Sequence, residues 1–215
     1  DIDNDGLDDV WGMHWGAYGN RNPIVLGSEL PGLEEDEDDP IRTLLTPDAE
    51  YTMPDLQYTI EGGADVDGDG TPDLMFAGVT DLHLFLSDSW TSGDFEIDDL
   101  SDFEIDDATY NITVEGEGDL IGYDMAFLSD MDGDGGAELL VGAPRNDDGG
   151  SNAGKTYLVY SSSLSGYDSS SSNINDIAEY TFIGESATDH SGASVANAGD
   201  VNGDGYADMI VGARE

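Results

Sequence analysis

Aspartate-rich ladders that turn around a glycine occur four times in this chain of 215 residues, and their side chains suit a divalent cation. They read DIDNDGLDD from Asp1, DVDGDGTPD from Asp65, DMDGDGGAE from Asp130 and DVNGDGYAD from Asp200. Ca²⁺ takes about six to eight oxygen ligands, and a glycine at position 6 permits the sharp turn that a calcium loop needs. Each ladder is therefore predicted to be a calcium loop.

The expected ligands are side-chain oxygens at positions 1, 3, 5 and 9 and a backbone carbonyl at position 7 of each ladder. The predicted sets are Asp1, Asp3, Asp5, Leu7 and Asp9; Asp65, Asp67, Asp69, Thr71 and Asp73; Asp130, Asp132, Asp134, Gly136 and Glu138; and Asp200, Asn202, Asp204, Tyr206 and Asp208. A single Asp-Gly turn needs no metal to explain it. Four copies with one ligand order favour metal binding.

The ladders differ from helix-loop-helix calcium sites, which place a bidentate Glu at position 12. Position 12 is occupied here by Gly12, Phe76, Val141 and Val211. Short apolar runs follow the last carboxylate at once, as in Leu139-Leu140-Val141. Such runs, bounded by Gly and Asp, are typical of buried β-strands. Each loop is predicted to lead into a strand.

The ladders begin 64, 65 and 70 residues apart, which indicates a repeat architecture. The stretches LIGYDMAFLSDMDGDGGAELLVGAP from Leu120 and HSGASVANAGDVNGDGYADMIVGAR from His190 resemble FG-GAP repeats, the blade unit of integrin α-subunit β-propellers and their microbial relatives. In that family a calcium loop joins the strand that carries FG to the strand that GAP closes. Gly122 and Gly192 take the FG position, and residues 142–144 and 212–214 take the GAP position. The second copy departs from the motif, with Gln57 in the FG position and Ala77-Gly78 in place of GAP.

The predicted fold is all-β, with propeller blades of four antiparallel strands, and incomplete, at about three to four blades of a larger propeller. Third and fourth strands are expected at residues 154–160 and 178–184, at 82–86 and 110–114, and at 23–26 and 41–45. The repeats are expected to divide the chain into a partial blade at 1–64, a second unit at 65–129, a third at 130–199 and a truncated fourth at 200–215. Equivalent loops should lie on one face of the disc, which leaves the other face for recognition.

Composition narrows the classes of partner. Asp and Glu number 49 against five Lys and Arg, so even four bound Ca²⁺ ions would change the formal charge only from −44 to −44 + 8 = −36. Nucleic acid and anionic membranes are poor partners for such a chain. The sequence has no Cys and no apolar run of about 18 residues, so neither disulfides nor direct membrane insertion are expected. A calcium-rich setting, extracellular or at the cell surface, is the predicted location.

Catalytic signals are weak. His14, His83 and His190 lie in different repeats, and no serine stands in a nucleophile-elbow motif. The chain is therefore predicted to be non-enzymatic, with a protein or glycan ligand, as the integrin resemblance implies. The alternative is the non-catalytic propeller portion of a secreted hydrolase or lyase. The serine-rich stretch 161–172 and the acidic runs 34–39 and 94–107 are expected to be loops.

Overall fold

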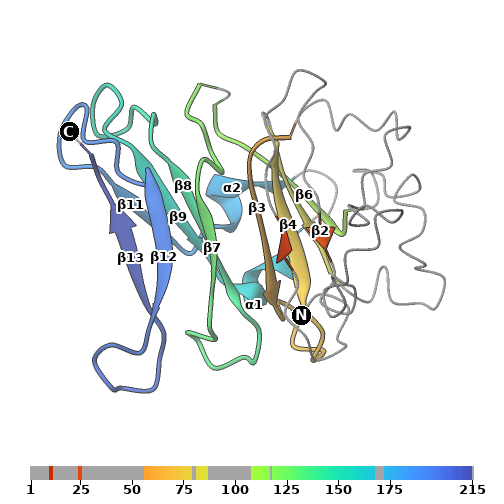
Figure 1. Ribbon diagram of the computed structural model, residues 1–215. Helices are drawn as coiled ribbons and strands as arrows, with labels where there is room; N and C mark the ends of the chain where they lie inside the picture. The colour runs from red at the N-terminus through yellow and green to blue at the C-terminus, as the bar shows by residue number, and fades with distance from the viewer. Residues whose placement is uncertain are drawn as a thin grey trace, which may run out of the picture.

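The structure is a computed structural model that describes residues 10–11, 24–25, 56–78, 81–86, 108–116, 118–167 and 172–214 (Figure 1). Most of its regular structure is β-strand. The strands are β1 (Val10–Trp11), β2 (Ile24–Val25), β3 (Leu56–Ala64), β4 (Asp73–Gly78), β5 (Asp81–Phe85), β6 (Tyr110–Thr113), β7 (Met125–Leu128), β8 (Glu138–Ala143), β9 (Lys155–Val159), β10 (Ser172–Asn173), β11 (Tyr180–Ile183), β12 (Ser194–Gly199) and β13 (Asp208–Gly212). The helices are single turns, α1 (Ser161–Leu164) and α2 (Ile174–Ile177).

Two sheets have the up-and-down order of a propeller blade. One runs β3-β4-β5-β6 and the other β7-β8-β9-β11, with every neighbouring pair in these runs antiparallel. The next repeat contributes the antiparallel pair β12-β13. The predicted all-β class with four antiparallel strands is thereby confirmed, while the division into 1–64, 65–129, 130–199 and 200–215 stays a prediction.

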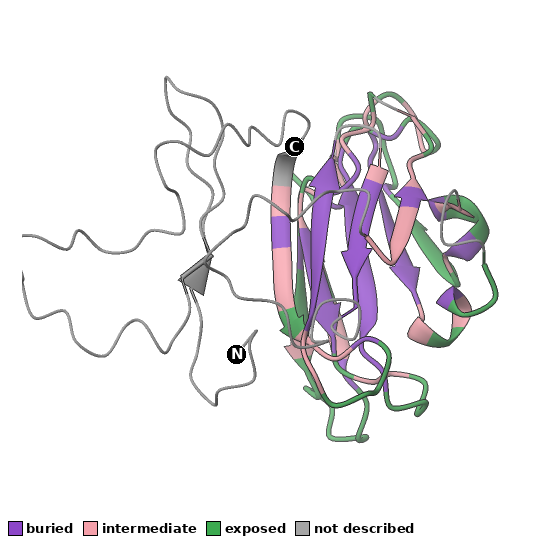
Figure 2. Cartoon of the chain, turned by 90° about the vertical axis from the view of Figure 1, so that its right-hand side faces the viewer, coloured by how far each residue is buried: buried purple, intermediate pink, exposed green. Residues whose placement is uncertain are grey.

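The sheets pack face to face, and their central strands are buried on both sides (Figure 2). In β8, Leu139 and Val141 pack toward the preceding sheet, in a cluster with Met75 and Leu84. Leu140 points the other way, toward Val195 of β12. Burial on both faces explains why these strands read as continuous apolar runs rather than as alternating patterns.

The FG and GAP positions of each repeat meet in space. Gly122 donates its backbone N–H to the carbonyl of Gly142 at 2.9 Å, and Gly192 does the same to Gly212 at 3.0 Å. Gly122 also lies against the preceding sheet, where an added Cβ would clash with Ala77 and come within 2.9 Å of Leu82 Cδ2. The FG glycine therefore allows close contact between neighbouring sheets.

The serine-rich stretch corrects one sequence prediction. Instead of being only a loop, it contains α1, and β10 pairs in parallel with β6 of the preceding sheet, with Ser172 opposite Ile112. Leu164 and, just beyond the stretch, Ile174 of α2 are buried in the core, which is why this polar sequence is held in place. In the part of the chain that the structure describes, no helix has the length and apolar character needed to cross a membrane.

Several predictions fall outside the described residues. These are the first ladder with Asp1, Asp3, Asp5, Leu7 and Asp9, the strand at 41–45, the acidic runs at 34–39 and 94–107, and His14. The strand predicted at 23–26 corresponds to β2, which pairs antiparallel with β1.

Candidate metal sites

The three described ladders occupy equivalent places in the fold. Residues 65–73 join β3 to β4, residues 130–138 join β7 to β8, and residues 200–208 join β12 to β13. All three lie at the same end of the sheets, at the bottom of Figure 1. Strands rather than helices flank them, which excludes a helix-loop-helix calcium site at these loops. Two loops also touch, because Ala137 donates its backbone N–H to the carbonyl of Asp65 at 2.8 Å.

A shared hydrogen-bond pattern folds each loop around its position-1 carboxylate. Asp65 accepts from the backbone N–H groups of Gly68 at 2.7 Å and Gly70 at 2.8 Å. Asp130 and Asp200 accept from the equivalent glycines of their own loops. These bonds turn the carboxylate toward the inside of the loop. In Asp200 they lower the pKa, with the Gly205 N–H as the largest cause.

Position 5 and position 7 are also linked in the same way in each loop. The backbone N–H groups of Thr71, Gly136 and Tyr206 donate to the carboxylates of Asp69, Asp134 and Asp204 at 2.7, 2.8 and 3.0 Å. Each position-6 glycine has a positive φ, between 94° and 98°. The turn predicted from the glycine is present in all three. The role of the position-7 carbonyls as ligands stays a prediction.

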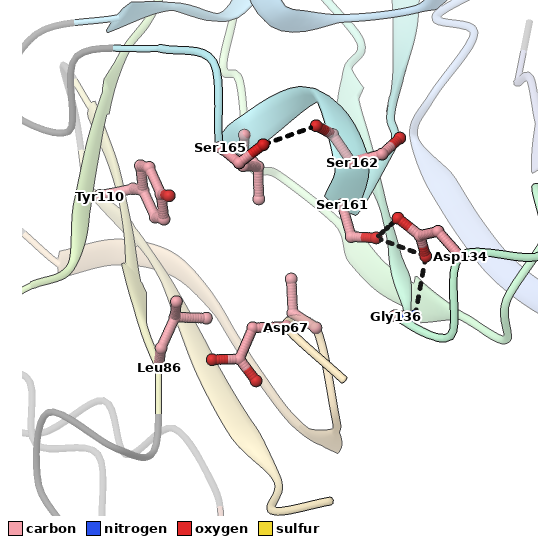
Figure 3. A pocket seen from close by; sticks show the side chains of 10 residues that line it. Asp67, Leu86, Tyr110, Asp134, Gly136, Ser161, Ser162 and Ser165 are labelled. Atoms are coloured by element: carbon pink, nitrogen blue, oxygen red, sulfur yellow. Dashed lines mark hydrogen bonds between the residues drawn. The ribbon is translucent and has the colours of Figure 1, made fainter. Parts of the chain in front are cut away.

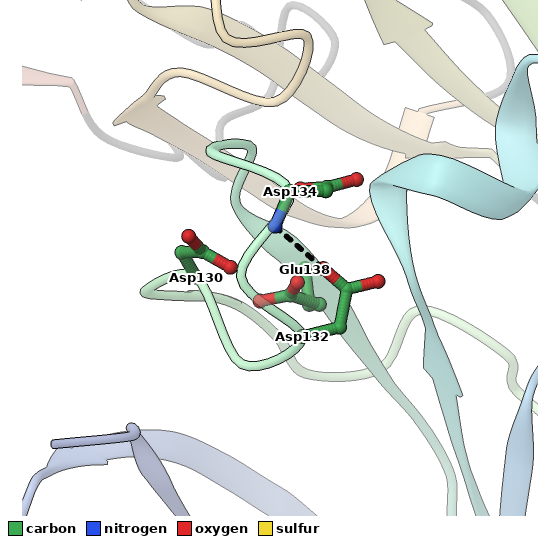
Figure 4. Close-up of side chains that lie close together, drawn as sticks. All are labelled: Asp130, Asp132, Asp134 and Glu138. Atoms are coloured by element: carbon green, nitrogen blue, oxygen red, sulfur yellow. Dashed lines mark hydrogen bonds between the residues drawn. The ribbon is translucent and has the colours of Figure 1, made fainter.

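Loop 130–138 gathers its four acidic side chains most closely. Asp130, Asp132, Asp134 and Glu138 each bring a carboxylate oxygen within 4.8 Å of the others (Figure 4). Glu138 is fully buried, and its Oε2 accepts from Met131 N–H at 2.9 Å. Its Oε1 is buried without a hydrogen-bond partner among the described residues. Burial raises the pKa of Glu138 to about 7, and repulsion from Asp132, Asp130 and Asp134 adds to the shift while the Met131 bond opposes it.

The four carboxylates of loop 130–138 suit a hard cation. A buried carboxylate oxygen without a partner costs free energy, and four converging carboxylates repel one another unless a positive charge lies between them. Ca²⁺ accepts this set of oxygen donors. Asp130, Asp132, Asp134 and Glu138 would hold it, and the ion would supply the missing counter-charge.

The other two described loops are less complete as carboxylate clusters. In loop 65–73, oxygens of Asp65, Asp67 and Asp73 lie within 4.8 Å of one another, while Asp69 is outside that group. Asp73 is fully buried and accepts from Val66 N–H at 2.6 Å. Loop 200–208 does not bring three carboxylates to that distance, and Asn202 donates instead to Asp204 at 3.0 Å. The predicted sites therefore differ in how far the fold assembles them.

Two serines of the stretch predicted to be a loop also contact predicted ligands. Ser161 Oγ donates to the carboxylate of Asp134, and Ser162 Oγ donates to Asp132 at 2.9 Å. The serines lie about 30 residues from these ligands in the chain, so no local sequence signal could have identified them.

A second polar cluster lies at the opposite end of the sheets. Lys155 of β9 is buried, and its Nζ donates to Glu115 at 3.0 Å, to Asp148 at 2.8 Å and to Asn175 at 3.1 Å. Burial would raise the pKa of Glu115, but hydrogen bonds from Tyr157 and Lys155 lower it overall. The cation is thus neutralised by its partners, and the cluster ties the end of one sheet to the next.

The described histidines have structural partners. His83 lies between Asn111, at 2.6 Å, and Asp81, at 3.0 Å. His190 Nδ1 is 3.0 Å from the carbonyl oxygen of Pro144. Each of these two imidazoles is therefore held by its own neighbours.

Comparison with known proteins supports the repeat assignment. The family model described as FG-GAP repeat matches residues 121–159 and 191–214, which include the loops 130–138 and 200–208. Integrin alpha-PS2 of Drosophila melanogaster is 36% identical over 109 residues, which cover 48% of this chain and 7% of the insect protein. The similarity therefore concerns a small part of that much longer protein.

Proposed function

Because this chain carries FG-GAP repeats folded as blade-like antiparallel sheets, we propose that it is a calcium-binding, non-enzymatic propeller module of an extracellular or cell-surface protein. Its calcium loops stabilise one end of the blades. The opposite end binds a partner, which we take to be a protein, as the resemblance to integrin α-subunits implies. A glycan is the second class of ligand.

The observation that carries the proposal is the buried Oε1 of Glu138, which has no hydrogen-bond partner among the described residues and lies close to three other carboxylates. A loop that only needed to turn would expose this side chain to water or replace it with an apolar residue. The recurrence of the same turn in loops 65–73 and 200–208 supports the extension to the other ladders. An affinity in the range of about 0.1–1 mM is expected, as for extracellular calcium modules.

Calcium acts in this proposal as a structural ion. With a formal charge of −44, the fold gains from any bound cation that reduces repulsion between carboxylates. A ligand that binds only the folded state stabilises it by RT ln(1 + [L]/Kd). Rigid loops at one end leave the turns at the other end free to vary for recognition.

Isothermal titration calorimetry with CaCl₂ tests the metal assignment. Binding heat is expected for the native chain, and the variant carrying both Asp134→Ala and Asp204→Ala should lose two sites. Asp176→Ala is a matched control, because Asp176 is an exposed carboxylate in α2, outside the ladders. No calcium-dependent heat, or equal stoichiometry in the native chain and the double variant, would contradict the proposal. Hydrolysis of a glycan or lipid panel, abolished by one carboxylate substitution outside the ladders, would favour the hydrolase alternative.

A further inference from the structure

Loop 130–138 is supported from outside by the helical turn α1, which follows β9 of the same sheet. Figure 3 shows Ser161 pointing at Asp134, with its Oγ 3.1 Å from Oδ1 and 2.9 Å from Oδ2. Ser162 Oγ lies 2.9 Å from Asp132 Oδ2. Gly136 is packed so closely below α1 that an added Cβ would be 2.5 Å from Ser161 Oγ. Two of the four clustered carboxylates are thus held by hydroxyl groups of another segment.

The turn that carries these hydroxyls is itself fixed in place. Leu164 at its end is buried in the main core, and Ser163 Oγ donates to Glu179 at 3.2 Å, just before β11. The helix has no side-chain cap at its N-terminus. The hydroxyls of Ser161 and Ser162 therefore serve the neighbouring loop rather than the helix.

Loop 200–208 offers an internal comparison. Its carboxylates accept hydrogen bonds from groups of the loop itself, such as Gly203, Gly205 and Val201. Within the described residues no side chain from outside the loop donates to Asp200, Asp204 or Asp208. In this chain, loop 200–208 therefore serves as a control loop, because its carboxylates do not depend on the hydroxyl groups of α1.

We propose that Ser161 and Ser162 are positioning residues for the ligands Asp134 and Asp132, and that their hydroxyl groups raise the calcium affinity of loop 130–138. This inference rests on the proposed calcium function. A carboxylate oxygen has two lone pairs, so it can accept from a hydroxyl and still bind a metal. Before the ion binds, the hydroxyl donors hold repelling carboxylates in the converged arrangement, which reduces the ordering that binding would otherwise require.

Site-resolved NMR on the full chain tests this, with CaCl₂ as the titrant and the amide signals of Gly135 and Gly205 as reporters. Both amides donate to the position-1 carboxylate of their loop. The variant with Ser161→Ala and Ser162→Ala should weaken binding at Gly135 about tenfold, the lower end of the range for outer partners of metal ligands, and leave Gly205 unchanged.

Two control variants separate positioning from general support of the fold. Ser165→Ala removes a hydroxyl that donates only to the Ser162 carbonyl among the described residues, at 3.1 Å, and should change neither signal. Replacing Ser161 and Ser162 with Thr keeps both hydroxyls and should restore affinity at Gly135. If the double Ala variant loses its folded spectrum, Ser162→Ala alone is measured, since Ser162 is exposed. Removing one of the two hydroxyls should then weaken binding at Gly135 about threefold, half of the tenfold loss on a logarithmic scale.

The outcomes distinguish this inference from the function on which it rests. Calcium binding at Gly135 that is equal in the native chain and in the alanine variants would overturn the positioning role while leaving the calcium assignment intact. Equal weakening at Gly135 and Gly205 would also overturn it, because the effect would then be global. A native chain whose loops show no response to calcium would overturn the proposed function and this inference together.

Discussion

Replacing Gly122 with Ala should strongly destabilise the fold, because this glycine combines two constraints. Its φ is +78°, in the region that costs other residues about 1–2 kcal/mol. An added Cβ would also clash with Ala77 and lie 2.9 Å from Leu82 Cδ2, and both neighbours are fully buried. Overpacking of that kind costs about 1–3 kcal/mol. Together the two effects predict a loss of about 2–5 kcal/mol in the free energy of unfolding.

Two further glycines allow the contributions to be measured separately. Gly63 has a φ of +91° but open space around it, so Gly63→Ala should lose only the conformational part, about 1–2 kcal/mol. Gly118 has neither constraint, and Gly118→Ala should change stability by less than about 0.5 kcal/mol.

Urea unfolding in saturating calcium, followed by circular dichroism, gives the three differences from midpoints and slopes. Destabilisation of Gly122→Ala no greater than that of Gly63→Ala would refute the argument that this glycine is needed for contact between sheets. If both variants matched Gly118→Ala, the backbone argument would be refuted as well.

Three other perturbations have expected outcomes. Chelating calcium should lower stability by about 1.4 kcal/mol per loop relative to calcium at ten times Kd, and superimposed melting curves with and without chelator would contradict this. Lys155→Met should lower the free energy of unfolding in urea by about 2–3 kcal/mol, because it leaves partly buried carboxylates without their cation. Arg145 is exposed, so Arg145→Met should have little effect. Equal losses in the two variants would contradict a stabilising role for the ion pairs of Lys155. Burial raises the pKa of Glu61 from 4.5 to about 7, so the protonated side chain favours the folded state. Its contribution to the free energy of unfolding is complete below pH 4.5 and is lost as pH rises through about 7. The difference in the free energy of unfolding between Glu61→Gln and the native chain should therefore increase in favour of the variant by about 1–2 kcal/mol from pH 5 to pH 8. This figure is reduced from the full pKa shift because solvent screens the partly exposed group. Parallel pH profiles of the two proteins would refute this.

Strand positions were largely predictable because they depend on short-range patterns. The apolar runs expected at 154–160 and 178–184 correspond to β9 and β11 to within a few residues. Turn residues on both sides define such runs. Every residue of β9 is buried, whereas every residue of β11 is exposed, so the limits of the runs predicted the strands and their burial did not. The serine-rich segment was different, since its polar composition hides the burial of Leu164, and only packing against the core makes its turn helical.

The loop conformations are determined by the sequence itself, because the bonds that fold them are local. In the three described loops, the position-1 carboxylate accepts from amides three to five residues ahead, and the glycine at position 6 supplies the positive φ within the same segment. A ladder can therefore be recognised, and its turn predicted, without knowledge of the remaining chain.

Tertiary structure decided how the loops differ from one another. The burial of Glu138, the bond from Ala137 to Asp65 and the hydroxyls of Ser161 and Ser162 all depend on segments brought together by packing of the sheets. Burial and long-range hydrogen bonds are set by which surfaces meet, and residues far apart in the chain carry no mutual signal in one sequence. Hence the turn of ladder 130–138 can be predicted from the ladder itself, whereas the groups that surround it are known only from the folded chain.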